Sequence, residues 1–95
     1  MATLARSIGL GLAARGDIDD VIRWARQARD GGLDSIWIHD SYYERDAITF
    51  GSSVATALAQ DGDSPFRLAL GAVNPFTRHP VVLAMTGSAL DEVLP

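Results

Sequence analysis

Three short apolar runs, each followed by a segment with helical periodicity, constrain the fold more than any other feature of this sequence. The runs lie at 7–12 (SIGLGL), 35–39 (SIWIH) and 67–72 (RLALGA), and the helical segments lie at 17–30, 47–59 and 80–93. Short apolar runs bounded by turn residues are typical of buried strands. Strand and helix therefore alternate three times, which predicts an α/β fold whose parallel strands are joined by right-handed crossovers. This pattern does not distinguish a doubly wound sheet from part of an eight-stranded barrel.

The ends of the helical segments carry recognisable signals. Asp17 precedes the first segment as a predicted N-cap, and Gly31-Gly32 follows it as a predicted stop. Pro80 suits the first turn of the third helix, because its missing N–H has no helical partner there. We expect that third helix to present an apolar face made of Val81, Val82, Met85, Ala89, Leu90 and Val93.

Composition excludes several classes of function. The 95 residues suit one small domain, and 47% of them are hydrophobic. The net charge of −4, with the basic residues scattered singly, argues against a nucleic-acid surface. Without cysteine there is no thiolate metal site or cysteine nucleophile. We expect a cytoplasmic protein with no membrane partner, because the chain shows neither a secretory signal nor an apolar run of about 18 residues.

Two glycines in the first apolar run allow two interpretations. Gly9, Gly11 and Ala14 match the dinucleotide-binding pattern G-x-G-x-x-[GA]. That pattern works when a helix opens directly at the glycines, whereas the helix-start signal here is Asp17. The alternative is that the glycines let the backbone pass close to something flat or bulky.

Two further sets of side chains are candidates for ligand contacts. His39, Asp40 and His79 follow strand ends and could be assembled as metal ligands, although histidines there are more often bonded locally, and we assign no metal. Among the aromatic residues we expect Trp24 and Trp37 in the core. Tyr42, Tyr43 and Phe76 are in loops and are better candidates for stacking on a ligand.

Polar clusters follow the second and third strands, at 39–46 (HDSYYERD) and 74–79 (NPFTRH). The carboxyl ends of parallel strands meet at one edge of the sheet, where α/β proteins place their sites. The sequence therefore predicts a binding site at this edge.

The same clusters carry a family resemblance. The segments IGLGL (8–12), GLDSIWIHDSYYERDA (32–47) and LGAVNPFTRHPVVLAMTGSALDEV (70–93) resemble the bacterial-luciferase-like family, and within it the deazaflavin-dependent methylenetetrahydromethanopterin reductases. The resemblance implies a (β/α)8 TIM barrel that binds FMN or coenzyme F-420 at its carboxyl end. Residues 1–95 would be an N-terminal fragment holding its first three β/α units, with the helices on one face of the sheet.

The resemblance also implies where the cofactor would lie. Gly71, Ala72, Val73 and Asn74 occupy the place of a bulge that supports the deazaflavin ring from behind. In relatives this bulge contains a non-prolyl cis peptide bond, and we expect one between Gly71 and Val73, at Gly71–Ala72.

Four polar residues complete the implied site. Asp40 is a candidate on the cofactor side, but Ser41 stands where relatives commonly have a histidine that handles protons. A hydroxyl cannot replace that base without an activating partner, so no catalytic residue is assigned. Arg78 and His79 are expected to anchor the loop by hydrogen bonds and to cap the next helix.

These features predict the N-terminal part of an F-420-dependent oxidoreductase that passes hydride to or from a small organic substrate. An FMN-dependent monooxygenase of the same family and a non-enzymatic α/β module are the alternatives. Three strands supply only part of the side chains that fill an eight-stranded barrel. We therefore expect the isolated 95 residues not to catalyse and to be partly unfolded, aggregated or rescued by self-association through their open strand edges, which leaves a homo-oligomer open.

Overall fold

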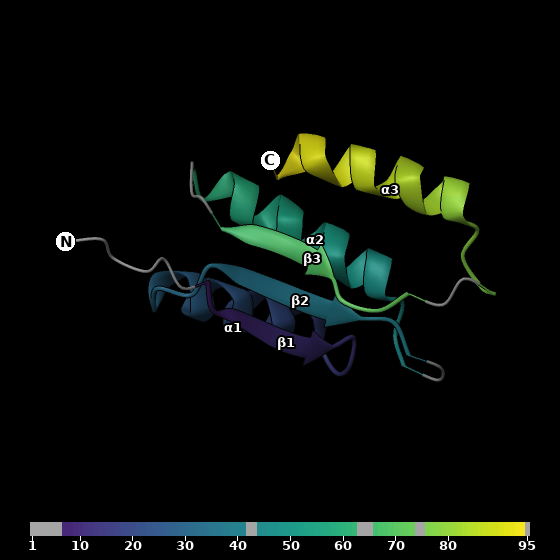
Figure 1. The fold of residues 1–95 in the computed structure, drawn as a ribbon. Helices are drawn as coiled ribbons and strands as arrows, with labels where there is room; N and C mark the ends of the chain where they lie inside the picture. The colour runs from purple at the N-terminus through teal and green to yellow at the C-terminus, as the bar shows by residue number, and fades with distance from the viewer. Residues whose placement is uncertain (1–6, 42–43, 63–65, 74–75, 95) are drawn as a thin grey trace.

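The computed structural model describes residues 7–41, 44–62, 66–73 and 76–94, which form three strands and three helices in strict alternation (Figure 1). The elements in chain order are β1 (Gly9–Ala13), α1 (Ile18–Asp30), β2 (Ser35–His39), α2 (Ala47–Gln60), β3 (Arg67–Leu70) and α3 (Pro80–Val93). The predicted order is confirmed. Within these ranges no helix combines the length and the apolar character that crossing a bilayer requires.

The three strands form one parallel sheet in the order β1-β2-β3, as predicted. Leu10 pairs with Ile36, which pairs in turn with Leu68, so these three side chains lie in one row across the sheet. The bounds of β2 and α3 match the prediction, whereas β1 is shifted toward its loop and β3 ends two residues early, at Leu70.

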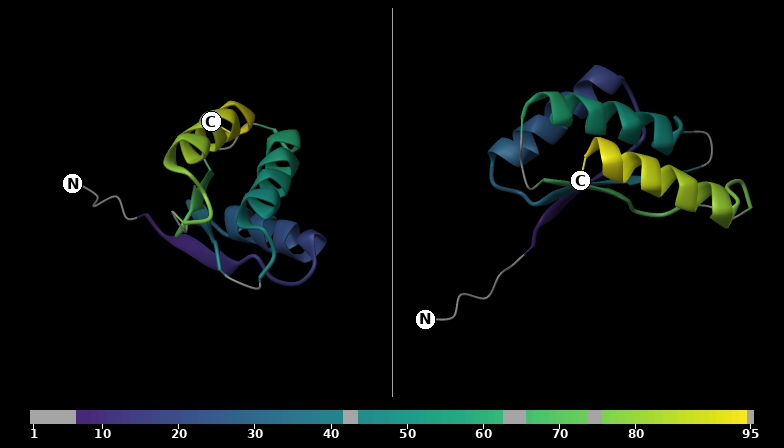
Figure 2. Two further views of the ribbon diagram at one scale, coloured as in Figure 1. Left: turned by 90° about the vertical axis from the view of Figure 1, so that its right-hand side faces the viewer. Right: turned by 90° about the horizontal axis from the view of Figure 1, so that it is seen from above.

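All three helices cover the same face of this curved sheet (Figure 2). Alternate strand residues point toward the helices, and Ile36 and Ile38 of β2 are completely buried beneath them. The remaining strand residues face the opposite, open side. The helix side holds the core: Ala14, Val21, Ala25, Ala28, Ile36, Ile38, Ala47, Phe50, Val54, Leu58 and Phe66.

Local chemistry explains where the helices begin. Each N-cap residue has an extended backbone and a side chain that accepts a hydrogen bond from the first turn, namely Asp17 for α1, Asp46 for α2 and His79 for α3. Helix α1 ends at Asp30 with Gly31 as its C-cap, and Gly32 follows in the left-handed region, with φ 94°, which a glycine adopts without strain. The cap predicted at Asp17 and the glycine stop are confirmed.

A cluster of charges ties α1 to the far end of α2. Asp61, the C-cap of α2, accepts hydrogen bonds from Arg26 Nε at 2.9 Å and from Arg29 Nη1 at 2.7 Å. A carboxylate at a helix C-terminus is unfavourable on its own, because the helix dipole is negative there. The hydrogen bond from Arg29 is the largest cause that lowers the pKa of Asp61, with Arg26 second. The two guanidinium groups therefore compensate for the misplaced charge.

Helix α3 is much less buried than the sequence predicts. Its apolar residues Val81, Val82 and Met85 are 61%, 52% and 65% exposed, and none of its residues is fully buried. A pocket of about 240 Å³ separates it from β3, lined by Leu68, Leu70, Gly87, Leu90, Asp91 and Leu94. Of the predicted apolar face, Leu90 is the member that turns toward the sheet. The others lack a neighbouring element on that side within the described chain.

Candidate functional site

The carboxyl ends of the strands gather the polar loops at one edge of the sheet, as predicted. Backbone hydrogen bonds hold these loops together beyond the strands themselves. Asp40 N, just after β2, donates to Ala72 O at 2.8 Å, and Arg45 N donates to Ala14 O at 2.8 Å. The loops that follow all three strands are thus joined into one surface.

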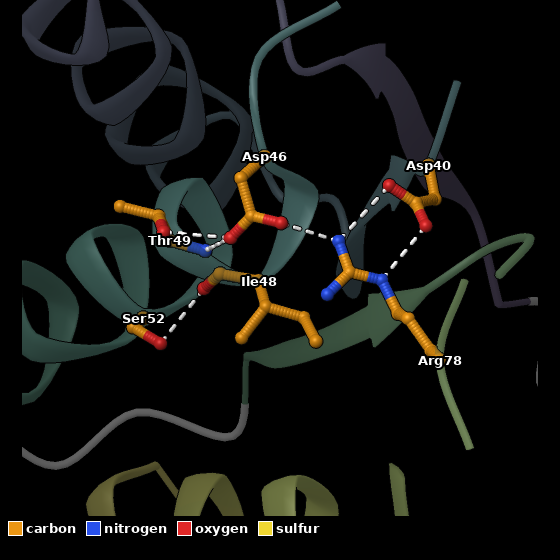
Figure 3. A network of polar contacts seen from close by, with 6 residues as sticks. All are labelled: Asp40, Asp46, Ile48, Thr49, Ser52 and Arg78. Atoms are coloured by element: carbon orange, nitrogen blue, oxygen red, sulfur yellow. Dashed lines mark hydrogen bonds and ion pairs between the residues drawn. The ribbon is translucent and has the colours of Figure 1, made fainter. Parts of the chain in front are cut away.

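Arg78 is the centre of a polar network on this edge (Figure 3). Its Nε donates to Asp40 Oδ2 at 2.7 Å and its Nη2 donates to Asp40 Oδ1 at 3.1 Å, which is the two-pronged geometry that a guanidinium favours with a carboxylate. The same Nη2 also pairs with Asp46 Oδ1. Arg78 therefore links the end of β2 to the start of α2 and to the turn that enters α3.

Asp46 has two roles in this network. Its Oδ2 accepts hydrogen bonds from Thr49 N at 2.9 Å and from Thr49 Oγ1 at 2.7 Å, so it caps α2 while it faces Arg78. The hydrogen bond from Arg78, followed by that from Thr49, lowers the pKa of Asp46 to about 2. Hydrogen bonds to Asp40 and Asp46 in turn raise the pKa of Arg78 further above its ordinary value. The network is therefore fully charged near neutral pH.

The anchoring roles expected for Arg78 and His79 are confirmed. Arg78 fastens the loop after β3, and only 18% of its side chain is exposed. His79 is the N-cap of α3, and its Nδ1 accepts a hydrogen bond from Val81 N at 3.1 Å. Both side chains explain why the stretch that follows β3 is so polar: it has to fix a turn and begin a helix in a few residues.

The segment from Gly71 to Val73 lies beside the end of β2. Gly71 N donates to Ile38 O at 2.8 Å, so the segment continues the hydrogen bonding of the sheet past the end of β3. The cis peptide bond expected between Gly71 and Val73 is wrong for this structure, because no described peptide bond is cis. Regular bonding to β2 accommodates the segment with trans bonds. Asn74, the last predicted cofactor residue, lies outside the described residues.

The open face of the sheet combines glycines with two large rings. Trp37 and His39 both project from β2 on this side, opposite the buried Ile36 and Ile38. The Trp37 indole lies against Gly9, where a Cβ atom would be 2.8 Å from Nε1. The His39 imidazole lies against Gly71, where a Cβ atom would collide with Nδ1 and Cε1. The glycines of β1 and of the loop after β3 thus make room for rings from the central strand.

This arrangement decides between the two interpretations of the glycine pattern. Gly9 and Gly11 lie inside β1, and α1 begins only at Ile18 behind its Asp17 cap. A dinucleotide-binding turn would need the helix to start at the glycines themselves. The close approach of a flat side chain, the Trp37 indole, is confirmed instead.

The structure does not bring the three candidate metal ligands together. Asp40 is bonded to Arg78, His79 turns its Nδ1 to the first turn of α3, and His39 lies on the open face. Among the residues that the structure describes, no three His, Asp or Glu side chains are close enough to hold a metal ion.

The aromatic residues are distributed differently from the prediction. Trp24 and Trp37 are 39% and 45% exposed, so placing them in the core is wrong. Trp24 lies on the outer side of α1, and Trp37 faces the open side of the sheet because it alternates with the buried isoleucines. Phe76, in the loop after β3, is 94% exposed, while Tyr42 and Tyr43 lie outside the described residues.

Sequence reasoning missed Asp46 and an ion pair between the first two loops. Asp46 could have been found, because an aspartate directly before a helical pattern is a typical N-cap. Arg15, after β1, donates to Glu44 Oε1 and Oε2 through its Nε at 3.2 Å each, and its Nη2 donates to Oε1 at 2.5 Å. No local signal joins these two residues, which are 29 positions apart.

Comparison with known proteins agrees with this architecture. The sequence model of the luciferase-like monooxygenase family matches residues 1–95. A 5,10-methylenetetrahydromethanopterin reductase from Methanolobus tindarius is 33% identical over 73 residues, which are 77% of this chain and 21% of the reductase. The chain thus spans about a fifth of the length of this curated relative. It belongs to the luciferase-like monooxygenase family, and its three parallel β/α units are consistent with the first units of that family's barrel.

Proposed function

Because the chain belongs to this oxidoreductase family, we propose that it forms the N-terminal part of a deazaflavin-dependent enzyme. In this proposal coenzyme F-420 accepts hydride from, or donates it to, a small organic substrate at the carboxyl ends of the strands. The observation that carries the proposal is the similarity to the methanopterin reductase, which extends over 77% of this chain. A deazaflavin supplies two-electron hydride chemistry, while the protein supplies binding, orientation and exclusion of water.

The residues at this edge fit a flat cofactor ring. Gly71, Ala72 and Val73 continue the edge of the sheet with small side chains, and we propose that they, with Asn74, lie along the ring. On the adjacent open face Gly11, Ala13 and Ala69, which flank Trp37 and His39, have at most a methyl group. A planar ring can approach a backbone closely only where side chains are this small.

Asp40 enters the proposal through its position. Both of its carboxylate oxygens accept hydrogen bonds from Arg78, at 2.7 and 3.1 Å, so it fixes the end of β2 directly beside Ala72. A carboxylate already bonded to a guanidinium is a poor general base, because its charge is stabilised. We therefore place Asp40 on the cofactor side as a residue that shapes the site.

An FMN-dependent monooxygenase is the second candidate, favoured by the description of the matching family. The two functions differ in the ring that binds, since FMN in its reduced form reacts with oxygen whereas a deazaflavin transfers hydride. The small residues at the strand ends would accept either ring.

A binding titration separates the candidates. The protein should be expressed from the complete reading frame that encodes this chain and titrated with F-420 and, separately, with FMN, following the fluorescence of each cofactor. We expect F-420 to bind with the lower dissociation constant. Tighter binding of FMN would favour the monooxygenase. Binding of neither cofactor would exclude both functions and favour a non-enzymatic module.

A further inference from the structure

We infer that the imidazole of His39 contacts the ring of the bound cofactor. The absence of a side chain at Gly71 leaves the space that this imidazole occupies. The inference rests on the proposed function and assigns the ring-facing polar contact to a particular side chain. It starts from the open face of the sheet, where His39 and Trp37 are the two large residues of the central strand.

The two rings lean in different directions. Trp37 Nε1 donates to Ser35 Oγ at 3.0 Å, and its indole lies against Gly9, so it turns toward the amino ends of the strands. His39 remains at the carboxyl ends. Its Nδ1 and Cε1 lie against Gly71 of the loop after β3, and its Nε2 is 3.5 Å from where a Cβ atom on Gly11 of β1 would be. The imidazole therefore reaches across the open face from one outer strand toward the other.

Among the described strand residues, no other polar side chain lies on this part of the open face. Its neighbours there are Gly11, Ala13, Ala69 and Gly71, which have at most a methyl group. Among the described residues, His39 makes no hydrogen bond or ion pair, and it is exposed. Its hydrogen-bonding capacity is therefore free for a ligand.

The charged groups nearby are already engaged or lie elsewhere. Asp40 is paired with Arg78, and Arg15 of the first loop is paired with Glu44. Arg67 lies on the same face as His39, but at the amino end of β3, in the row of Ser35. Among the described strand residues at the carboxyl end of the open face, the imidazole of His39 is thus the polar group that faces a ligand.

An imidazole suits the edge of a flavin or deazaflavin ring. Such rings present carbonyl oxygens and an imide N–H, and a neutral imidazole offers one donor and one acceptor nitrogen. A hydrogen bond from the protein to the ring also adjusts the electron distribution of a redox cofactor. Gly71 determines where that imidazole stands, because any side chain at position 71 would displace it.

The test uses the protein from the complete reading frame and the dissociation constants of F-420 and FMN. We expect His39→Leu, which keeps the bulk and removes both nitrogens, to raise the constant of the preferred cofactor about tenfold. His39→Gln keeps a donor and an acceptor and should stay within about threefold of the unsubstituted protein. His79→Asn is the matched control, because His79 turns its Nδ1 to the first turn of α3 and asparagine retains that helix cap, so it should leave binding unchanged.

A double substitution tests the role of Gly71. Gly71→Ala should weaken cofactor binding by displacing His39. In the His39→Leu background the same substitution should weaken binding little further. Additive losses would contradict the inference that Gly71 acts by positioning His39. Unchanged binding in His39→Leu, or failure of His39→Gln to restore it, would overturn the contact while the proposed function stands. Binding of neither cofactor by the unsubstituted protein would overturn both proposals. Thermal unfolding of each variant confirms that the fold is retained.

Discussion

Helices α2 and α3 have similar lengths and compositions but lie in different environments. Each has 14 residues and is predominantly apolar. Helix α2 buries Ala47, Phe50, Gly51, Val54, Ala55 and Leu58, whereas α3 buries no residue completely. The difference lies in the neighbours: α2 packs between α1 and α3 and over two strands, while α3 contacts α2 on one side and stands away from β3 (Figure 2). Helical periodicity and capping residues predict that a helix will form, and its neighbours decide how much of it is buried.

The largest expected effect on stability comes from a side-chain truncation in α2, the buried helix. Phe50 is 1% exposed and lies in the middle of the core. We expect Phe50→Ala to lower the free energy of unfolding of the 95-residue chain by about 3–5 kcal/mol, because it removes a buried ring and leaves a cavity. Urea unfolding followed by circular dichroism measures the change.

The matched control is the corresponding truncation in α3. Met85 is 65% exposed, so Met85→Ala should change the free energy of unfolding of the same chain by less than about 0.5 kcal/mol. A loss of 2 kcal/mol or more, on the order of a buried methionine truncation, would mean that α3 is covered in solution, for instance by a second copy.

The next effect concerns how α3 is attached. Its beginning is held by the Arg78 network, in which the Arg78 and Asp40 side chains are 18% and 13% exposed. Arg78→Gln should lower the free energy of unfolding by about 2 kcal/mol, because two carboxylates would lose their charged partner. Arg15→Gln is the control: that side chain is 75% exposed, and its loss should cost less than about 1 kcal/mol. Equal losses for the two variants would contradict a special role for Arg78.

A smaller and opposite effect is expected within α3. Gly87 lies in the helix interior, and a Cβ atom built on it meets no other atom within 4 Å. Gly87→Ala should therefore stabilise the chain by about 0.5–1 kcal/mol, since alanine loses less backbone entropy in a helix. Destabilisation in thermal unfolding would show that something packs closely against α3 at this position.

The smallest effect is the pH dependence of the cap of α2. The pKa of Asp46 is lowered to about 2, so its ionised form is favoured by folding. This contribution is fully present above about pH 5, where an unfolded aspartate is also ionised, and it is lost as the pH falls toward 2. It should stay below about 1 kcal/mol, because the side chain is 48% exposed and water screens the pair. Urea unfolding between pH 5 and 2 should show a shallower decline for Asp46→Asn; identical slopes would contradict this role.

The order of the elements could be predicted because each one carries its own local signal. Alternating apolar runs and caps such as Asp17 act within a few residues, and they place α3 correctly to the residue. The carboxyl-end location of the polar loops also follows from parallel topology alone. These features need no knowledge of distant contacts.

The errors arose where distant segments decide the outcome. Trp37 alternates with Ile36 and Ile38, but which side of the strand is buried depends on where the helices lie. The pairing of Arg78 with Asp40 and Asp46 joins residues 38 and 32 positions apart, and no local pattern encodes it. The exposure of α3 likewise depends on what lies beside it. Contacts between side chains that are far apart in the sequence can be identified only once the topology of the sheet is known.

The Arg78 network has a consequence for exchanging modules between related barrels. One guanidinium joins the carboxylates of the second β/α unit to the entrance of the third helix. A chimera that replaces the third unit alone would bring in a new residue opposite Asp40 and Asp46, and would leave two negative charges facing each other unless an arginine came with it. The second and third units should therefore be transplanted as a pair, with the crossover point placed outside the stretch from Asp40 to Arg78.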